Sequence, residues 1–217
     1  MTYREDGKPG PELREGVAAA MYSADDDMPV LGPEVGRRYT YTDYYDWNDG
    51  VRRELIEGRP IAMGAPTTVH QDILGNLYVQ FWMFLRGKPC RVYLSPFDVR
   101  LNADEKDDTV VQPDLLVVCD RTKLSDRKTC KGAPDLIVEV PSPSSASYDC
   151  VVKYGQYQKA GVREYWIVDP ETRTLRVCLL DDGQYAVTTY GESDVVRVGI
   201  LPGLTVSMPE VFAATAI

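Results

Sequence analysis

Two apolar segments of this chain begin with the same Pro-Asp dipeptide, and the second carries an acid in its interior. The segments are residues 113–118 (PDLLVV) and 134–140 (PDLIVEV). Apolar strands of this kind are typically buried, and an ionised carboxylate buried without a partner is very costly. Glu139 must therefore be neutralised, hydrogen-bonded or placed on a metal ion. Of these three solutions, only the metal ion would by itself do chemistry.

The side-chain period of a strand predicts where these acids lie. It places Asp135 and Glu139 on one face of the second segment. If the two segments pair antiparallel, the start of the first lies beside the end of the second, and Asp114 and Glu139 become neighbours at one rim of a sheet. Two carboxylates and a sheet-end carbonyl, such as that of Val140, are hard oxygen ligands of the kind that Mg²⁺ or Mn²⁺ prefers. We therefore expect Asp114, Glu139 and Val140 to bind a divalent metal ion.

A basic residue follows on the next expected helix. This helix comes after a Pro- and Ser-rich turn at 141–145 and carries Lys153 and, one turn later, Tyr157. Packed back on the sheet, it can bring Lys153 over the carboxylates. There the ammonium could orient an attacking water and stabilise charge on a phosphate, while the metal lowers the pKa of the water. Tyr157 could donate a hydrogen bond to a carboxylate or only pack its ring.

Three further side chains could belong to the same site, and each also has an ordinary structural explanation. His70, the only histidine, lies near the start of a long expected helix and could approach the phosphate or the water shell of the metal. Glu54 and Asp98 alternate with apolar neighbours and could extend the acidic cluster, or be surface or ion-paired residues. Asp114 and Lys153 also have structural explanations. Asp114 could be no more than a turn residue that precedes a strand after Pro113, and Lys153 could be a solvated helix residue.

The elements that must position these residues predict an α+β, or mixed α/β, domain. In order, we expect a short helix, a hairpin, a long helix, three strands, a second helix, a further strand and a final hairpin. Their ranges are 42–47, 54–63, 67–86, 92–101, 112–119, 135–140, 147–160, 164–168, 174–180 and 184–190. In the long helix an apolar residue recurs every four positions from Val69 to Leu85, reinforced by Trp82, so one broad face should pack on a sheet.

The composition is that of a folded protein with a distinct N-terminal segment. The 217 residues are 44% hydrophobic and 26% charged, which excludes collagen-like, coiled-coil and wholly disordered chains. Residues 1–36 hold three basic and eight acidic side chains, so we expect a mobile acidic tail before a domain at 37–217. The tail could be solubilising, mimic DNA or bind a partner. No apolar run approaches the roughly 18 residues that cross a bilayer, so we expect a cytoplasmic protein with no membrane partner.

Charge and cysteine content narrow the expectations further. The net charge of −9 argues against indiscriminate binding to nucleic acid, although residues 121–131, with five basic side chains and one acidic, could meet a phosphate backbone or form a solvated loop. The cysteines are odd in number and have no C-x-x-C spacing, so neither a disulfide framework nor a zinc site is expected, and they are interpreted as small buried residues. They are Cys90, Cys119, Cys130, Cys150 and Cys178.

Taken in order, the motifs between residues 39 and 212 resemble the Uma-type endonuclease family of the PD-(D/E)XK, or restriction-endonuclease-like, superfamily. The segments that carry the resemblance are 54–58 (ELIEG), His70 with 75–77 (GNL), 96–99 (PFDV), 111–118 (VQPDLLVV), 132–140 (GAPDLIVEV), 142–144 (SPS), 153–157 (KYGQY) and 161–169 (GVREYWIVD). Each is weak alone, and their common order makes the signal specific.

The resemblance implies a mixed sheet flanked by helices and a metal-dependent endonuclease that hydrolyses DNA phosphodiester bonds with Mg²⁺ or Mn²⁺. Asp114 would be the first acidic ligand, Glu139 the second and Lys153 the basic member. The superfamily pattern places that lysine two residues after the glutamate, where this chain has Pro141, so the following helix would supply it instead. Superfamily members often dimerise, which makes a homodimer a further expectation. The alternative hypothesis is a nuclease fold kept as a binding or assembly module without turnover.

Overall fold

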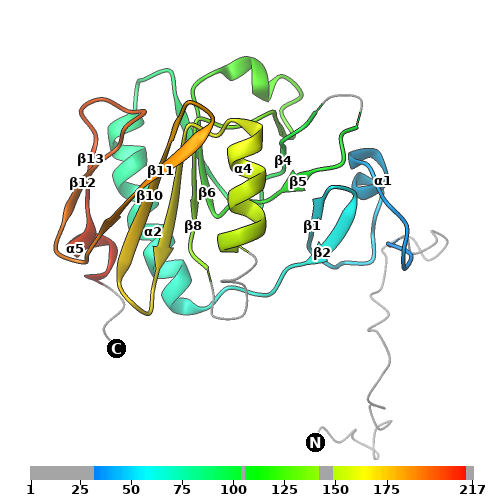
Figure 1. Cartoon of the computed structure of the whole chain (residues 1–217), viewed down its shortest axis with the longest axis horizontal. Helices are drawn as coiled ribbons and strands as arrows, with labels where there is room; N and C mark the ends of the chain where they lie inside the picture. Colours follow the sequence, from blue (N-terminus) through cyan, green and yellow to red (C-terminus); the bar gives the residue numbers. More distant parts are fainter. Residues whose placement is uncertain (1–31, 104–105, 142–148, 214–217) are drawn as a thin grey trace, which may run out of the picture.

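The centre of the molecule is a mixed six-stranded sheet. The computed structural model describes residues 32–103, 106–141 and 149–213, so most of the expected N-terminal tail, residues 1–31, lies outside the described part. The strand order is β11-β10-β9-β8-β6-β3, and only the β8–β9 pair is parallel (Figure 1). The strands are β3 (Arg91–Leu94), β6 (Leu115–Val118), β8 (Leu136–Glu139), β9 (Glu164–Asp169), β10 (Thr174–Asp181) and β11 (Gln184–Tyr190).

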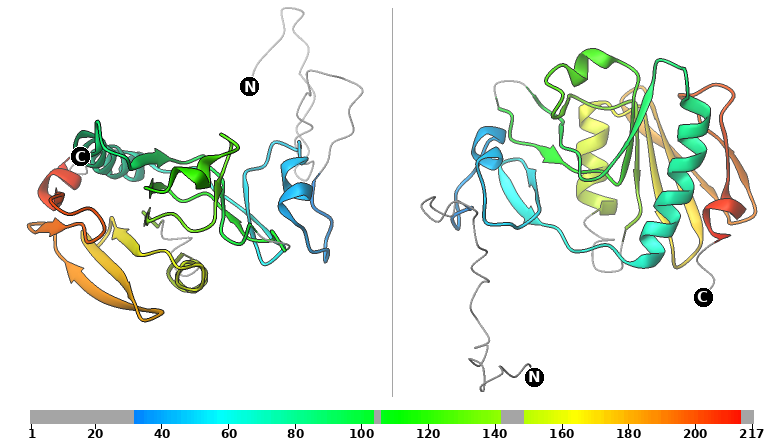
Figure 2. Two further views of the ribbon diagram at one scale, coloured as in Figure 1. Left: turned by 90° about the horizontal axis from the view of Figure 1, so that it is seen from above. Right: turned by 180° about the vertical axis from the view of Figure 1, so that it is seen from behind.

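Two helices cover opposite faces of this sheet. α2 (Thr68–Leu85) lies on one face, and α4 (Tyr154–Ala160), which continues the π-type turn η2 (Asp149–Lys153), lies on the other (Figure 2). Alternation along the strands explains the two layers, because Leu115 and Val138 pack with α2 whereas Leu116 and Ile137 pack with α4. The predicted mixed sheet flanked by helices is confirmed.

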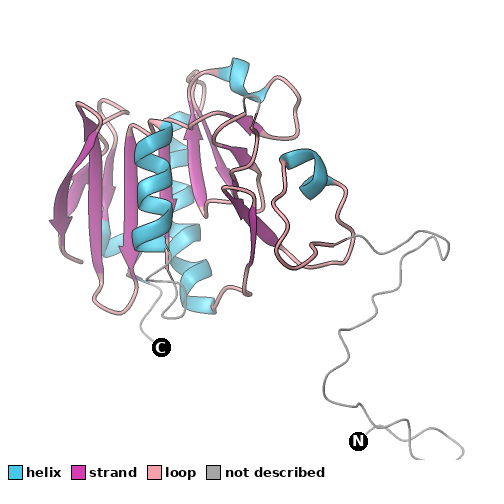
Figure 3. Cartoon of the chain, turned by 45° about the vertical axis from the view of Figure 1, so that its right-hand side comes forward, coloured by secondary structure: helices cyan, strands magenta, loops and turns pink. Residues whose placement is uncertain are grey.

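A smaller five-stranded sheet lies beside the central sheet and carries the N-terminal part of the described chain (Figure 3). Its order is β2-β1-β5-β4-β7, with α1 (Tyr41–Tyr45) packed next to it. The strands are β1 (Arg53–Ile56), β2 (Arg59–Ala62), β4 (Val99–Arg100), β5 (Val110–Val111) and β7 (Cys130–Lys131). The β1–β2 hairpin turns at Glu57 and Gly58, whose φ angles of 48° and 76° are both left-handed, as a tight hairpin requires.

The C-terminal segment closes the molecule against α2. It contains the ribbon β12 (Val195–Arg197) and β13 (Thr205–Ser207), followed by the short helix α5 (Met208–Val211). The side chain of Gln80 accepts from the N–H of Ser207, and Asn76 donates to the carbonyl of Val211. These contacts fix the segment along one flank of α2.

Three expectations about the elements need correction. The single strand expected over 92–101 is two strands in different sheets, β3 and β4, and the chain leaves the first ladder at Pro96, which has no N–H to donate. The strand expected over 112–119 begins only at Leu115, and residues 112–114 form the connection between β5 and β6. Trp82 does not reinforce the buried stripe of α2, because 44% of its surface is exposed.

The expectation that no disulfide forms is wrong. Cys90 and Cys119 are bonded to one another. The antiparallel register explains the pair, because Arg91 of β3 lies opposite Val118 of β6, and the two cysteines are the next residues outward. Cys130 and Cys178 are buried, as expected, and the side chain of Cys150 lies outside the described part.

Within the part of the chain that is described, we find no helix with the length and apolar character needed to traverse a bilayer. The longest helix, α2, has instead one buried face, formed by Ile73, Leu74, Leu77, Phe81 and Leu85.

The packing of α2 on the sheet predicts a large loss of stability when its central aromatic is removed. Phe81 is fully buried, and its ring centroid lies 5.7 Å from that of Trp166. We expect Phe81→Ala to lower the free energy of unfolding by about 3–5 kcal/mol in urea titrations. Gln71→Ala, on the exposed side of the same helix, should change it by less than about 0.5 kcal/mol. Equal losses in the two variants would contradict this packing.

Candidate functional site

Asp114 and Glu139 meet at one rim of the central sheet. The last described pair between β6 and β8 is Leu115 opposite Val138, so the next residues in register are Asp114 and Glu139. The N–H of Val140 donates to Asp114 Oδ2 at 2.8 Å, and the backbone nitrogen of Asp114 lies 3.5 Å from Glu139 Oε2. The antiparallel pairing expected from the sequence thus brings the two acids together.

Glu139 is buried and engaged by two donors from the α4 side. Its exposed fraction is 3%. Its Oε1 accepts from the Tyr157 hydroxyl at 2.6 Å and from Lys153 Nζ at 3.0 Å. Burial, and then the charge of Glu139, raise the pKa of Tyr157 well above its ordinary value. The phenol therefore stays protonated and serves as a hydrogen-bond donor that orients the carboxylate.

Lys153 joins the two sheets. It comes from η2, is 3% exposed, and its Nζ lies 2.9 Å from Glu54 Oε1 as well as 3.0 Å from Glu139 Oε1. Glu54 is 2% exposed on β1, and its Oε1 also accepts from the N–H of Gln112 at 2.8 Å. The structure thus places Glu54 beside the basic residue, and the ammonium is shared between one carboxylate from each sheet.

His70 contacts the acidic rim from the opposite face. It lies in the first turn of α2, which Thr67 caps by accepting from the N–H of His70. Its Nε2 is 3.1 Å from Asp114 Oδ2. Its Nδ1 is buried and has no hydrogen-bond partner among the described residues. The tautomer with hydrogen on Nε2 satisfies Asp114 and leaves only a lone pair unpaired at Nδ1.

Asp98 belongs to a neighbouring network rather than to the acidic pair. Its Oδ1 accepts from Gln112 Nε2 at 2.9 Å and from the Tyr44 hydroxyl at 3.1 Å. Gln112 is held in turn by Arg52, whose Nη2 lies 2.8 Å from Gln112 Oε1. Desolvation is the main cause of the raised pKa of Asp98. Asp98 thus reaches the site only through Gln112, which donates to it by its side chain and to Glu54 by its backbone.

Sequence reasoning did not single out Gln112 or Arg52. A polar residue directly before Pro-Asp gives no periodic signal. The importance of Gln112 follows from its partners on two other segments, Arg52 and Glu54 at the start of β1 and Asp98 just before β4. The only hint in the sequence is that Gln112 belongs to the 111–118 motif, which by itself assigns it no role.

The basic segment 121–131 lies at the other end of the sheet from the acids. It connects the far end of β6 to the start of β8, whereas Asp114 and Glu139 are at the near end, about 13 Å away along four strand residues. The segment includes the 3₁₀ turn η1 (Arg121–Leu124). Lys128 donates to the Tyr45 hydroxyl and Lys131 lies 3.4 Å from Asp126, so part of its positive charge is used locally.

Asp135, the second Pro-Asp acid, is a structural residue at that same far end. Its Oδ2 accepts from the N–H of Cys119 at 2.7 Å, and its Oδ1 lies 2.9 Å from Arg163. Neither contact involves the acidic rim. The two identical dipeptides thus occupy opposite ends of neighbouring strands.

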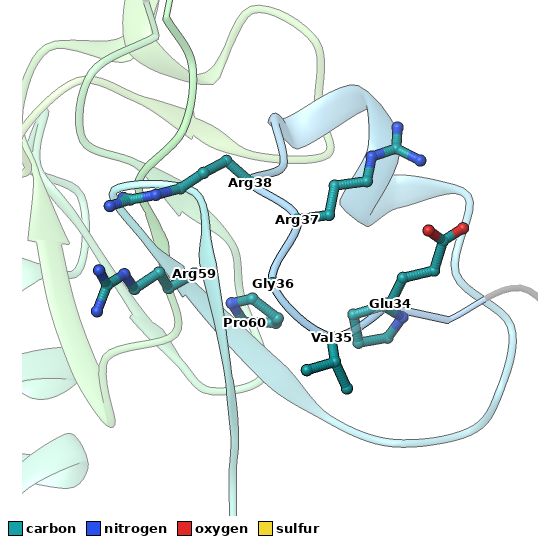
Figure 4. Close-up of a pocket in the computed structure, with 8 residues that line it drawn as sticks. Glu34, Val35, Gly36, Arg37, Arg38, Arg59 and Pro60 are labelled. Carbon is teal, nitrogen blue, oxygen red and sulfur yellow. The ribbon is translucent and has the colours of Figure 1, made fainter.

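A separate concavity of about 420 Å³ lies next to the β1–β2 hairpin (Figure 4). Arg37, Arg38 and Arg59 line it together with Pro60 and the segment 33–36. Arg37 is paired with Asp43 and Arg38 donates to the carbonyl of Glu57, so two of its cations are already engaged. It shares no residue with the acidic rim.

The donor set of the rim fits a hard divalent cation. Glu54 and Glu139 share the ammonium of Lys153, Asp114 adds a carboxylate beside Glu139, and Val140, the next residue in the chain, has a neutral carbonyl oxygen. Asp114 is 16% exposed at its side chain, and its Oδ1 has no hydrogen-bond partner among the described residues. Among the described residues, no group of three His, Cys, Asp or Glu side chains lies close enough together to hold a metal ion without further ligands. Mg²⁺ commonly uses only one or two carboxylates and completes its shell with water, so two acids and a carbonyl suffice.

Comparisons with known proteins point to one family. The model of the Uma2 family, described as “Putative restriction endonuclease”, matches residues 40–209. “Uncharacterized protein slr1290” of Synechocystis sp. (strain ATCC 27184 / PCC 6803 / Kazusa) is 26% identical over 202 residues, which are 90% of this chain and 98% of that protein. The crystal structure of “a putative nuclease belonging to DUF820” from Anabaena variabilis ATCC 29413 has a TM-score of 0.66 at 18% identity and covers 81% of this chain and 98% of its own. This last likeness shows that the fold is shared.

The shared ammonium predicts a strong effect of removing Lys153. Lys153→Met would leave the buried Glu54 and Glu139 without their cation, and we expect the free energy of unfolding to fall by about 3–5 kcal/mol in urea titrations. Lys159→Met is the matched control, since Lys159 is exposed on the following helix and lies 3.7 Å from Glu57; its effect should stay within about 0.5 kcal/mol. A double variant, Lys153→Met with Glu54→Gln, should recover part of the loss. Equal effects of the two lysine changes would show that the buried ion pairs do not stabilise the fold.

Asp98 predicts a pH dependence of stability with a definite sign. Its folded-state pKa lies above the ordinary value of 3.8, so the folded protein binds this proton more tightly than the unfolded chain does. The contribution is present at low pH and is lost as pH rises through the folded-state pKa. Asp98→Asn should therefore gain stability relative to the parent protein as the pH rises above about 4, measured by urea titration at each pH. Exposed Asp181→Asn is the control, and an identical pH profile of parent and Asp98→Asn would contradict the assignment.

Proposed function

The chain belongs to the Uma2 family, whose description is “Putative restriction endonuclease”, and on this premise we propose that it is a metal-dependent endonuclease that hydrolyses phosphodiester bonds of DNA. The observation that carries the proposal is the convergence of Asp114, Glu139 and Lys153. Three segments distant in sequence meet at this sheet rim, where Lys153 Nζ contacts the Glu139 carboxylate and the backbone nitrogen of Asp114 lies 3.5 Å from the same carboxylate. Glu139 and Lys153 are each 3% exposed, and buried ionisable groups with a specific charge partner are typical of catalytic sites.

In this proposal Asp114, Glu139 and the carbonyl of Val140 hold Mg²⁺ or Mn²⁺. The bound cation would lower the pKa of a water molecule and polarise the phosphoryl group. The surrounding residues fix the ligands before any metal arrives. His70 Nε2 and the N–H of Val140 both contact Asp114 Oδ2, which directs the other oxygen of this carboxylate away from them.

In this proposal the ammonium of Lys153 is a second positive charge at the site, in addition to that of the metal ion. Glu54 and Glu139 contact its Nζ at 2.9 and 3.0 Å, so the ammonium is held at a fixed position in a site from which most water is excluded. In such surroundings a fixed charge acts more strongly on developing negative charge than it would in water. We propose that Lys153 stabilises charge on the phosphoryl oxygens and orients the attacking water.

Arg52 is the cation best placed to contact the DNA backbone near these acids. It is exposed, and two of its nitrogens lie 3.2 and 2.8 Å from Gln112 Oε1, two residues before Asp114. Guanidinium has five donors, so others remain to bind a phosphate. An arginine here would also offset the local negative charge, which otherwise repels DNA.

We further propose that the protein acts in the cytoplasm, where bacterial DNA is found.

A second candidate function is favoured by a specific observation. Glu139 Oε1 already accepts hydrogen bonds from Lys153 and Tyr157. In addition, the described residues contain no group of three His, Cys, Asp or Glu side chains that could hold a metal ion. A nuclease fold whose acidic rim is held closed by its own lysine could act as a DNA-binding or assembly module without turnover. Calorimetric titration with Mn²⁺, combined with a DNA cleavage assay, separates the two candidates, because only the first requires both metal uptake at the rim and turnover.

The duplicated Pro-Asp dipeptide provides a matched test of catalysis. We expect plasmid DNA to be nicked or linearised with Mg²⁺ or Mn²⁺ and to stay intact with EDTA. Asp114→Asn and Glu139→Gln should each reduce the rate by at least about 100-fold, whereas Asp135→Asn, at the far end of the strands, should keep activity within a few-fold. Circular dichroism would verify that each variant is folded.

Two outcomes would contradict the proposal. One is metal-dependent cleavage that persists in folded Asp114→Asn and Glu139→Gln, which would show that a contaminating nuclease is responsible. The other is Mn²⁺ binding without cleavage of duplex or single-stranded DNA, which would favour the non-catalytic module.

A further inference from the structure

Helix α2 presents an apolar strip to the outside of the molecule. Val79, Trp82 and Met83 are 57%, 44% and 57% exposed on the side of the helix turned away from the sheet. In the view from behind, α2 lies outermost, and no described element crosses over it (Figure 2). Helix α5 packs along the flank of α2 through Asn76 and Gln80 and leaves the strip open.

Val79 and Trp82 of this strip are the middle of a longer seam with the spacing of a helix–helix contact. The seam consists of five positions at intervals of three, four, three and four residues: Asp72, Gly75, Val79, Trp82 and Arg86. Such spacing keeps residues on one face and is the pattern by which one helix packs on another. Its N-terminal end is negative, its centre apolar and its C-terminal end positive. Asp72 has no ion pair with the described residues that could account for its charge.

We propose that this seam binds the same seam of a second copy of the chain, with the two α2 helices antiparallel around a two-fold axis near Val79. The seam is symmetric about this residue to within one position, because Asp72 precedes it by seven and Arg86 follows it by seven, while Gly75 precedes it by four and Trp82 follows it by three. Each Asp72 therefore lies beside an Arg86 of the other copy, and the apolar centres meet. A two-fold contact of this kind uses one self-complementary patch on both copies. The proposal does not rest on nuclease activity.

Gly75 and Trp82 give the seam its shape. A Cβ at Gly75 would meet no heavy atom within 4 Å, so the helix surface has a gap there. In the antiparallel pairing each Trp82 faces the Gly75 of the other copy, and a large ring fills the gap. Buried tryptophans are among the side chains that contribute most to interfaces. The guanidinium of Arg86 lies 5.0 Å from the Trp82 ring centroid, so the cation and the ring form one surface.

Charge selects the antiparallel pairing and a second copy as the occupant. A parallel pairing would place Asp72 beside Asp72 and Arg86 beside Arg86, and like charges in contact are unfavourable. A single helix pair is smaller than the ~1,200 Å² of standard interfaces, so the dimer should be weak and depend on concentration.

The first test measures the oligomeric state. We expect sedimentation velocity between about 1 and 200 μM to show a monomer–dimer equilibrium with a dissociation constant on the order of micromolar. Trp82→Glu should make the chain monomeric throughout this range. Val187→Asp, a change at a 50% exposed apolar residue of β11, is the matched control and should leave the equilibrium unchanged. A parent chain that stays monomeric at 200 μM, or dimers that survive Trp82→Glu, would overturn the proposal.

The second test addresses the geometry by charge exchange. Asp72→Arg alone and Arg86→Asp alone should each weaken dimerisation at least about 10-fold, because each creates two like-charge contacts. The double variant, Asp72→Arg with Arg86→Asp, should restore the dissociation constant of the parent to within a few-fold. Failure of the double variant to restore it, with circular dichroism showing a folded chain, would exclude the antiparallel seam. Association only with a different protein would likewise overturn the proposal.

Discussion

The arrangement of the candidate site depends on one ammonium group shared by two buried carboxylates. Glu54 belongs to the smaller sheet and Glu139 to the central sheet, and each is nearly inaccessible to solvent. Removing two carboxylates from water costs more than an ion pair usually returns, so the arrangement persists only if the geometry is close and the remaining oxygens are hydrogen-bonded. Lys153 at 2.9 and 3.0 Å meets the first condition, and the donors Tyr157 and Gln112 meet the second.

The same requirement explains why the two sheets meet where they do. Gln112 directly follows β5 and donates its backbone N–H to Glu54. Two residues later, Asp114 directly precedes β6. A short stretch of chain thus spans both sheets and carries the groups that satisfy one acid and present another. Fully satisfied polar networks are rigid, and a rigid rim keeps the ligand oxygens in place without a metal to organise them.

The sequence predicted local relations well and relations between distant segments poorly. Once 113–118 and 134–140 are taken to pair antiparallel, a condition that the sequence itself did not settle, the register predicts that Asp114 and Glu139 are neighbours, and the structure has this pairing. It could not predict that Glu54 pairs with Lys153, since that contact needs β1 to join β5 some 55 residues later along the chain. The Cys90–Cys119 pair was missed for the same reason: its spacing has no local signature, and only the β3–β6 register reveals it.

Helix α2 shows how two periodicities can be superimposed on one element. Its buried positions follow the four-residue repeat that packs on the sheet, and His70 at its first turn continues toward Asp114. Trp82 fits that apolar pattern in sequence, yet lies on the opposite side, where the three-and-four spacing from Asp72 to Arg86 forms a second seam. An apolar residue on a helix therefore indicates a contact but not which one, and the exposed fraction in the structure decides between the core and a surface that is available to another chain. Because the helix that supports the acidic rim also carries this seam, any change in its position would be transmitted to His70 and to the oxygen of Asp114 that it contacts.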